Sequence, residues 1–178
     1  VVLSGAGGLL VESMINKRNP TDIPAALMIG LADPNIDRWH PILNLVQGLA
    51  EASDGVNHGH YLLRDPLDGD PARHVFHSFG IGDTYTPDST QYALARSMRV
   101  DQVTNGNDPL DYLTEEVVPL TGNHWTNGEQ ITGAVLLYEP NQGNDGHYVL
   151  FDLANAQRQY AHFLATSVRD EMPTIVAP

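Results

Sequence analysis

Short apolar segments alternate with helical patterns along this chain, and the alternation limits the folds that the chain can form. Residues 1–3, 74–80 and 131–138 have the composition of buried strands. A helix is predicted from Asp88, and an amphipathic helix is predicted over residues 152–168. Because buried strands that alternate with helices form parallel sheets with crossover connections, we predict an α/β fold.

Two long segments between the predicted strands have patterns of their own. The hydrophobic pattern of residues 9–52 predicts three helices. The third begins at Asp33 and has Trp39 and Leu49 on its apolar face. These helices fit either a lid over a cleft or ordinary core. Residues 101–130 are rich in turn-forming residues and predict a loop-rich insertion.

The predicted sheet is small, and the chain begins within one of its strands. The chain opens in mid-strand, on Val1-Val2-Leu3. Three strands make a small sheet, and its open edge is a state that proteins usually avoid. We therefore expect further strands upstream, and we expect this chain to be a piece of a longer polypeptide.

The charge balance excludes several classes of partner. The chain carries 22 Asp and Glu against 9 Lys and Arg, a net charge of −13. Nucleic-acid binding needs clustered Lys and Arg, so this balance excludes it, and docking on anionic lipid is disfavoured for the same reason. No apolar run approaches the roughly 18 residues of a membrane span. Cysteine is absent, which excludes disulfides and thiolate chemistry.

Two titratable residues follow predicted strands, at the edge where parallel sheets carry their functional groups. Asp83, in GIGDTYTP, lies between a predicted strand and a predicted helix. His147, in NDGHYVLFD, lies between a glycine-rich loop after the next buried strand and the last helix. A carboxylate that orients a histidine, and a histidine that transfers a proton, both need fixed positions on a rigid sheet.

Three segments of the sequence resemble bacterial α/β-hydrolase esterases and lipases. FGIGDTYTPDSTQYALARSM is similar to their acid turn, where a strand runs into G-x-x-D-x-x-x-P and the next helix carries a Q-x-x-A-like pattern. DGHYVLFD resembles their histidine loop, and VLSGAGGLL resembles the strand that leads into a helical lid. The order acid and then histidine also matches the Ser…Asp…His order of that fold.

The resemblance implies a fold and two catalytic roles. It implies that residues 1–178 form the C-terminal portion of an α/β-hydrolase domain, with residues 9–52 as its lid. Asp83 would be the catalytic acid and His147 the catalytic base, and no cofactor is implied.

The serine nucleophile of that family is not found in this chain. Its motif is G-x-S-x-G, and this sequence contains no such motif. Ser4 is the only serine directly after a predicted strand and before a helix. The positions two before and two after it are Val2 and Ala6, whereas the strained elbow needs glycine at both. We therefore expect the nucleophile and the oxyanion donors on a segment upstream.

Simpler interpretations remain open for these residues. Asp83 could be an ordinary helix-entry aspartate, and His147 an ordinary loop histidine. His124, in GNHWTN, is a rival for the catalytic histidine. His124 and the neighbouring Trp125 are also candidates for substrate binding, although Trp125 could equally be a packing aromatic.

Two segments have a composition that can suggest metal binding. His58, His60 and Asp54 could form a cluster, but no second ligand pair stands at zinc spacing. The segment DPLDGDP offers carboxylates as calcium loops do, but it lacks the EF-hand pattern and its closing Glu. We therefore predict a turn there, and no metal.

Two functional hypotheses follow. The first is a serine-dependent carboxylic ester hydrolase, to which this chain supplies the acid and the histidine. Its partners would be a small-molecule or lipid ester and the N-terminal half of the same fold, in cis or as a separate chain. The second is a non-catalytic α/β-hydrolase-like binding or structural module, which the missing G-x-S-x-G motif favours. The compartment is open. The resemblance favours an exported protein, periplasmic, outer-membrane-associated or secreted, and the acidic, lysine-poor composition suits export or a salty medium.

Overall fold

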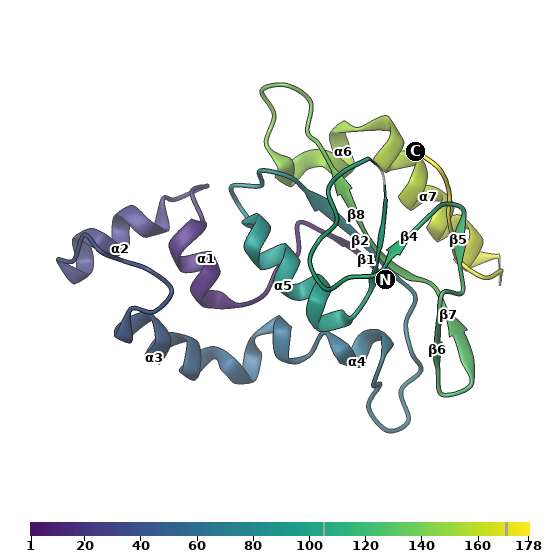
Figure 1. The fold of residues 1–178 in the computed structure, drawn as a ribbon, viewed down its shortest axis with the longest axis horizontal. Helices are drawn as coiled ribbons and strands as arrows, with labels where there is room; N and C mark the ends of the chain where they lie inside the picture. Colours follow the sequence, from purple (N-terminus) through teal and green to yellow (C-terminus); the bar gives the residue numbers. More distant parts are fainter. Residues whose placement is uncertain (105, 170) are drawn as a thin grey trace.

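The central element of the fold is a parallel sheet of five strands (Figure 1). A computed structural model describes residues 1–104, 106–169 and 171–178. In spatial order the strands are β1 (Val2–Ser4), β2 (Val75–Gly80), β8 (Gly133–Tyr138), β3 (Asp101–Val103) and β4 (Glu115–Glu116). The α/β fold with a parallel sheet, predicted from the alternation of strands and helices, is confirmed.

The two longest strands form the middle of the sheet. β2 and β8 pair along six residues, from Val75 opposite Gly133 to Gly80 opposite Tyr138, and every residue of both strands is buried. Strands that are covered on both faces are rich in apolar residues, and this composition is why both strands could be predicted from the sequence, although β2 also contains the polar residues His77 and Ser78. β1 pairs with β2 on its other side, so the three predicted strands lie next to one another.

The segment expected to be a loop-rich insertion contributes more than loops. Besides β3 and β4, residues 101–130 contain β5 (Leu120–Thr121), β6 (His124–Thr126) and most of β7 (Glu129–Ile131). β5 pairs with β9 (Thr174–Ile175), and β6 and β7 form a hairpin. These strands have two or three residues each, too few for a periodic pattern to emerge. The main sheet therefore has five strands instead of the expected three.

Helices cover both faces of the sheet. α4 (His60–Leu63) and α5 (Asp88–Met98) lie on the face where Val75, Phe79 and Val135 point. α6 (Val149–Asp152) and α7 (Ala154–Val168) lie on the opposite face, where Phe76 packs against Phe163. Figure 1 shows α5 and α7 on either side of the strands. A short turn of helix, η3 (Gly146–Tyr148), precedes α6.

The helices of residues 9–52 project beyond the sheet (Figure 1). They are α1 (Leu10–Asn16), α2 (Ile23–Leu31) and α3 (Pro41–Ala50), followed by the turns η1 (Glu51–Ser53) and η2 (Gly55–Asn57). The third helix begins at Pro41 and not at Asp33, because a proline suits the first turn of a helix and disfavours helix before it. Trp39 and Leu49, expected on an apolar face, are exposed.

No helix in the described ranges is both long and apolar enough to cross a bilayer.

His77, in the middle of β2, makes the stability of the fold depend on pH. Its side chain is fully buried, and burial lowers its pKa to about 4. The unfolded chain binds a proton on this residue near pH 6.5, whereas the folded chain does not until about pH 4. We predict that this difference lowers the free energy of unfolding by about 2 kcal/mol between pH 8 and pH 5.

Urea unfolding of the wild type and of His77→Gln at both pH values measures this contribution. Glutamine cannot titrate, and it keeps a donor for the carbonyl of Ala6, which His77 Nε2 contacts at 3.2 Å. The decrease in the free energy of unfolding should be about 2 kcal/mol smaller in the variant. An equal decrease in both proteins would contradict the assignment.

Candidate active site

The turn after β2 holds the carboxylate of Asp83 in one orientation. Asp83 Oδ1 accepts hydrogen bonds from the backbone N–H groups of Tyr85 at 2.8 Å and Thr86 at 2.7 Å. Asp83 Oδ2 accepts one from the side-chain amide of Gln91, in α5, at 3.2 Å. Gln91 is itself buried and also donates to the carbonyl of Thr86 at 2.8 Å. The carboxylate of Asp83 therefore has little freedom to rotate.

Asp88, the first residue of α5, closes the same turn from the other side. Its Oδ1 accepts from the backbone N–H groups of Gly82 at 3.0 Å and Asp83 at 3.2 Å. Gly82 has a φ of +72°, a left-handed conformation that glycine adopts without strain. Burial raises the pKa of Asp88, the two backbone hydrogen bonds oppose the rise, and the charge of Asp83 adds to it.

The second loop of the site presents His147 from the end of β8. Asp145 caps η3, and its Oδ1 accepts the backbone N–H of His147 at 2.9 Å. Gly146 lies against the end of β2, where a Cβ on Gly80 would stand 2.5 Å from the carbonyl carbon of Gly146. This close approach of two glycines brings the histidine loop against the acid turn.

The two loops place His147 and Asp83 in direct contact. His147 Nδ1 lies 3.0 Å from Asp83 Oδ2, although 64 positions separate the residues in the sequence. The side chain of Asp83 is fully buried, whereas that of His147 is 30% exposed. Within the described part of the chain, Nε2 of His147 makes no hydrogen bond. A carboxylate on Nδ1 favours the tautomer whose Nε2 can accept a proton, which is the state a general base needs.

Aromatic rings and a glycine surround the imidazole of His147. The ring of Tyr85 stacks on it at a centroid distance of 4.8 Å, and Tyr148 meets it edge-on at 5.2 Å. Gly5, directly after β1, has a φ of +54°, and a Cβ there would lie 2.9 Å from Nδ1 and Cε1 of the ring. A side chain at position 5 would therefore push against His147.

Asp145 joins the two loops in addition to capping η3. Its carboxylate accepts hydrogen bonds from the backbone N–H of Thr84, at 3.2 Å, and from the hydroxyl of Thr84. Burial alone would raise the pKa of Asp145, but these hydrogen bonds and the one from His147 N–H lower it below its ordinary value. Thr84, which follows Asp83, and Asp145, which stands two residues before His147, thus form a second bridge between the loops.

Removal of this bridge should loosen both loops without unfolding the protein. In Asp145→Ala the N–H groups of Thr84 and His147 lose their acceptor. We expect the free energy of unfolding to fall by about 1–2 kcal/mol, and amide exchange at Thr84 and His147 to accelerate by about tenfold. Hydrogen exchange followed by NMR measures both. Asp68→Ala, at an exposed turn, is the matched control and should change neither quantity. Unchanged exchange at both amides would refute the bridge.

The structure places Ser4 at the end of β1, directly before the glycine that packs on His147. Ser4 is the last residue of the strand and lies opposite Ser78 of β2. Its hydroxyl makes no hydrogen bond to His147 among the residues described.

His124 and Trp125 lie away from Asp83 and His147. His124 Nε2 contacts the carbonyl of Gly133, the first residue of β8, at 3.0 Å, whereas His147 follows the last residue of that strand. His124 is buried and Trp125 is 68% exposed on the β6–β7 hairpin. The expected substrate-binding role therefore has no geometric support at this site, because the hairpin leads into the beginning of β8 and not away from its end.

Asp54 and His58, two of the three candidate metal ligands, make other contacts. The carboxylate of Asp54 accepts the backbone N–H groups of Leu9 and Leu10, both at 2.8 Å, and so caps the start of α1. His58 Nε2 contacts the carbonyl of Ala52 at 3.0 Å. Across the described ranges, no group of three or more His, Asp or Glu side chains has the geometry to hold a metal ion.

Comparison with known proteins gives no relative for this chain. No protein-family model, no curated protein and no solved structure matches it.

Proposed function

We propose that this chain supplies the acid and the base of a serine-dependent carboxylic ester hydrolase. The observation that carries the proposal is the hydrogen bond between His147 Nδ1 and Asp83 Oδ2, at 3.0 Å. A buried carboxylate that is fixed by three further donors, and an imidazole with an open Nε2, form the acid–base half of a catalytic triad.

The order of the strands supports an α/β-hydrolase fold as the setting. The acid turn follows β2 and the histidine loop follows β8, and these strands are parallel neighbours. β1, the strand that resembles the one preceding the lid, lies next to β2 at the edge of the sheet. We propose that a segment carrying the nucleophile adds to this edge, in cis or as a separate chain.

In the proposed reaction His147 moves protons and Asp83 orients it. Nε2 of His147 takes the proton of the serine hydroxyl as the serine oxygen attacks the ester carbonyl. The imidazolium then gives this proton to the leaving alcohol, and an acyl-enzyme remains. Nε2 next takes a proton from water, whose oxygen attacks the acyl carbonyl. The imidazolium then gives this proton to the serine oxygen as the bond between that oxygen and the acyl carbon breaks, which releases the acid and restores the serine hydroxyl and the neutral histidine. Asp83 keeps its charge throughout and stabilises the imidazolium.

Contacts between the acid turn and residues 9–52 support a lid role for the latter. Nζ of Lys17 donates to the carbonyl of Tyr85 at 2.6 Å. The backbone N–H groups of Arg18 and Asn19 donate to the carbonyl of Thr84 at 2.9 and 3.0 Å. The segment after α1 is therefore fastened beside His147, while α2 leaves Ile29 84% exposed. We propose that these helices border the cleft for a small-molecule or lipid ester.

The alternative is a non-catalytic module that keeps the fold without the chemistry. The missing G-x-S-x-G motif favours it.

An assay of p-nitrophenyl butyrate hydrolysis distinguishes the ester hydrolase from the non-catalytic module. The protein is assayed at its full natural length, which is called the natural polypeptide below. An acyl-transfer enzyme should release a burst of about one equivalent of p-nitrophenol as the acyl-enzyme forms, and a slower steady state should follow. Absence of turnover above the rate in buffer, with the polypeptide folded, would favour the non-catalytic module.

A further inference from the structure

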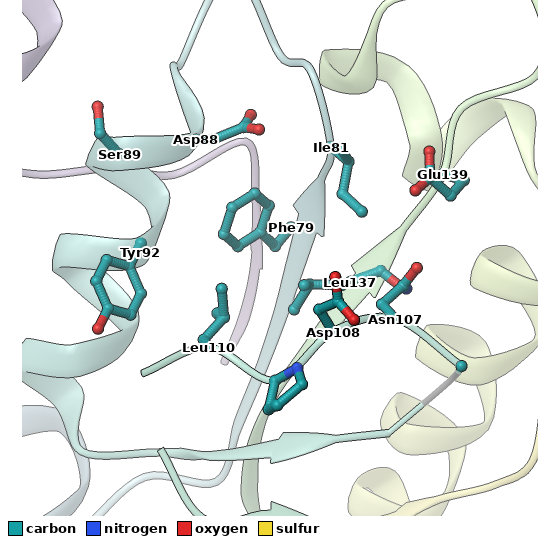
Figure 2. A pocket seen from close by; sticks show the side chains of 12 residues that line it. Phe79, Ile81, Asp88, Ser89, Tyr92, Asn107, Asp108, Leu110, Leu137 and Glu139 are labelled. Carbon is teal, nitrogen blue, oxygen red and sulfur yellow. The ribbon is translucent and has the colours of Figure 1, made fainter. Parts of the chain in front are cut away.

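A cavity on the α5 side of the sheet belongs to no role assigned above. It has a volume of about 630 Å³, within the range of small-molecule sites. Figure 2 shows Phe79, Ile81 and Leu137, from the ends of β2 and β8, forming its apolar wall. Tyr92 of α5 and Leu110 border the opposite side.

Hydrogen bonds to the sheet hold the loop that closes the cavity in place. Asn107 donates to the carbonyl of Leu137, in β8, at 2.9 Å. The buried side chain of Gln102, in β3, donates to the carbonyl of Asp108 at 3.2 Å and accepts the N–H of Leu110 at 2.6 Å. These contacts fix residues 107–110 against the sheet. The wall that this loop forms is therefore held in place by hydrogen bonds of the fold itself.

The charged groups around this cavity have one sign. Asp88 of α5, Asp108 of the loop after β3 and Glu139, directly after β8, line it, and Figure 2 shows them around its apolar wall. No Lys, Arg or His is among the lining residues that the structure describes. Apolar and aromatic walls with carboxylates at the margin complement a ligand that joins an apolar body to a positive charge.

We propose that this cavity binds an organic monocation, an alkyl- or arylalkylammonium, whose apolar part lies against Phe79 and Leu137. The proposal does not depend on the proposed hydrolase function. Because Asp88 also accepts the backbone N–H groups of Gly82 and Asp83, the ligand would lie beside the acid turn. A cation there would offset the burial that raises the pKa of Asp88.

Titration of the ¹⁵N-labelled chain with phenylbutylammonium tests the proposal. Saturable shifts of the amides of Ile81 and of residues 106–110 are expected, with a Kd of about 1 mM or tighter. Phenylbutanol, which has the same apolar body without the charge, should bind about tenfold more weakly. Phenylbutanoate should bind more weakly still.

Two variants test whether the carboxylates of the cavity contribute to ammonium binding, and neither changes a residue of the acid turn. Asp108→Asn and Glu139→Gln change exposed side chains, and each should weaken ammonium binding by about threefold. Glu129→Gln, which changes an exposed side chain of β7, is the control and should bind like the wild type. The proposal is overturned if phenylbutanol binds as tightly as the ammonium, if both cavity variants bind unchanged, or if no saturable shift occurs.

Discussion

Replacement of His147 by alanine should lower kcat for p-nitrophenyl ester hydrolysis by about 10⁴-fold in the natural polypeptide. The variant has no group that can take the serine proton. Asp83→Asn should cost a similar factor, because an amide at that position favours the wrong tautomer of the imidazole. Steady-state kinetics of both variants, with KM determined separately, measure these losses.

The control for both variants is His162→Ala, which removes an exposed histidine of α7. It should retain wild-type turnover. Circular dichroism and thermal unfolding should show that all three variants fold. Near-wild-type kcat in either His147→Ala or Asp83→Asn would refute the assignment of these residues.

The second large effect is expected at Gly80, where the two loops of the site meet. A Cβ on this residue would overlap the backbone carbonyl of Gly146, which no side-chain rotation can relieve. Gly80→Ala should therefore force η3 away from β2 and lower the free energy of unfolding by about 3 kcal/mol or more. It should also break the contact between His147 and Asp83. Urea unfolding measures the first effect.

Gly48→Ala is the matched control for this substitution. Gly48 lies within α3, and a Cβ there would meet no atom within 4 Å. The change should leave stability unaltered or raise the free energy of unfolding by about 0.5–1 kcal/mol, since alanine favours helix over glycine. The interpretation fails if Gly80→Ala is as stable as the wild type.

The long buried strands and the two loops that follow them could be predicted from the sequence. β8 is a continuous apolar run and β2 is mostly apolar apart from His77 and Ser78, and Asp83 and His147 stand among glycines after them. β3 could not be predicted from periodicity, because Asp101 and Gln102 are polar residues that become buried through partners in the tertiary structure. Gln102, for example, bonds to the backbone of Asp108 and Leu110.

Several residues of the candidate site carry only a weak signal in the sequence. Asp145 stands two residues before His147, a spacing typical of a side chain that caps a helical turn, but its bridge to Thr84 depends on the fold. Gln91 is the glutamine of the Q-x-x-A-like pattern, but its contact with Asp83 requires α5 to lie beside the turn and could not be predicted from that pattern. His124 is the first residue of β6. Its contact with Gly133, at the beginning of β8, likewise depends on the β6–β7 hairpin, which the sequence did not predict.

Covalent labelling by a fluorophosphonate tests the central claim most directly. The natural polypeptide should react at a single serine, identified by mass spectrometry of its peptides, to about one equivalent. The same reaction should be lost in His147→Ala, because the serine is then not activated. Failure of the wild type to react, or equal labelling of the wild type and His147→Ala, would contradict the role of His147 as the base that activates a serine.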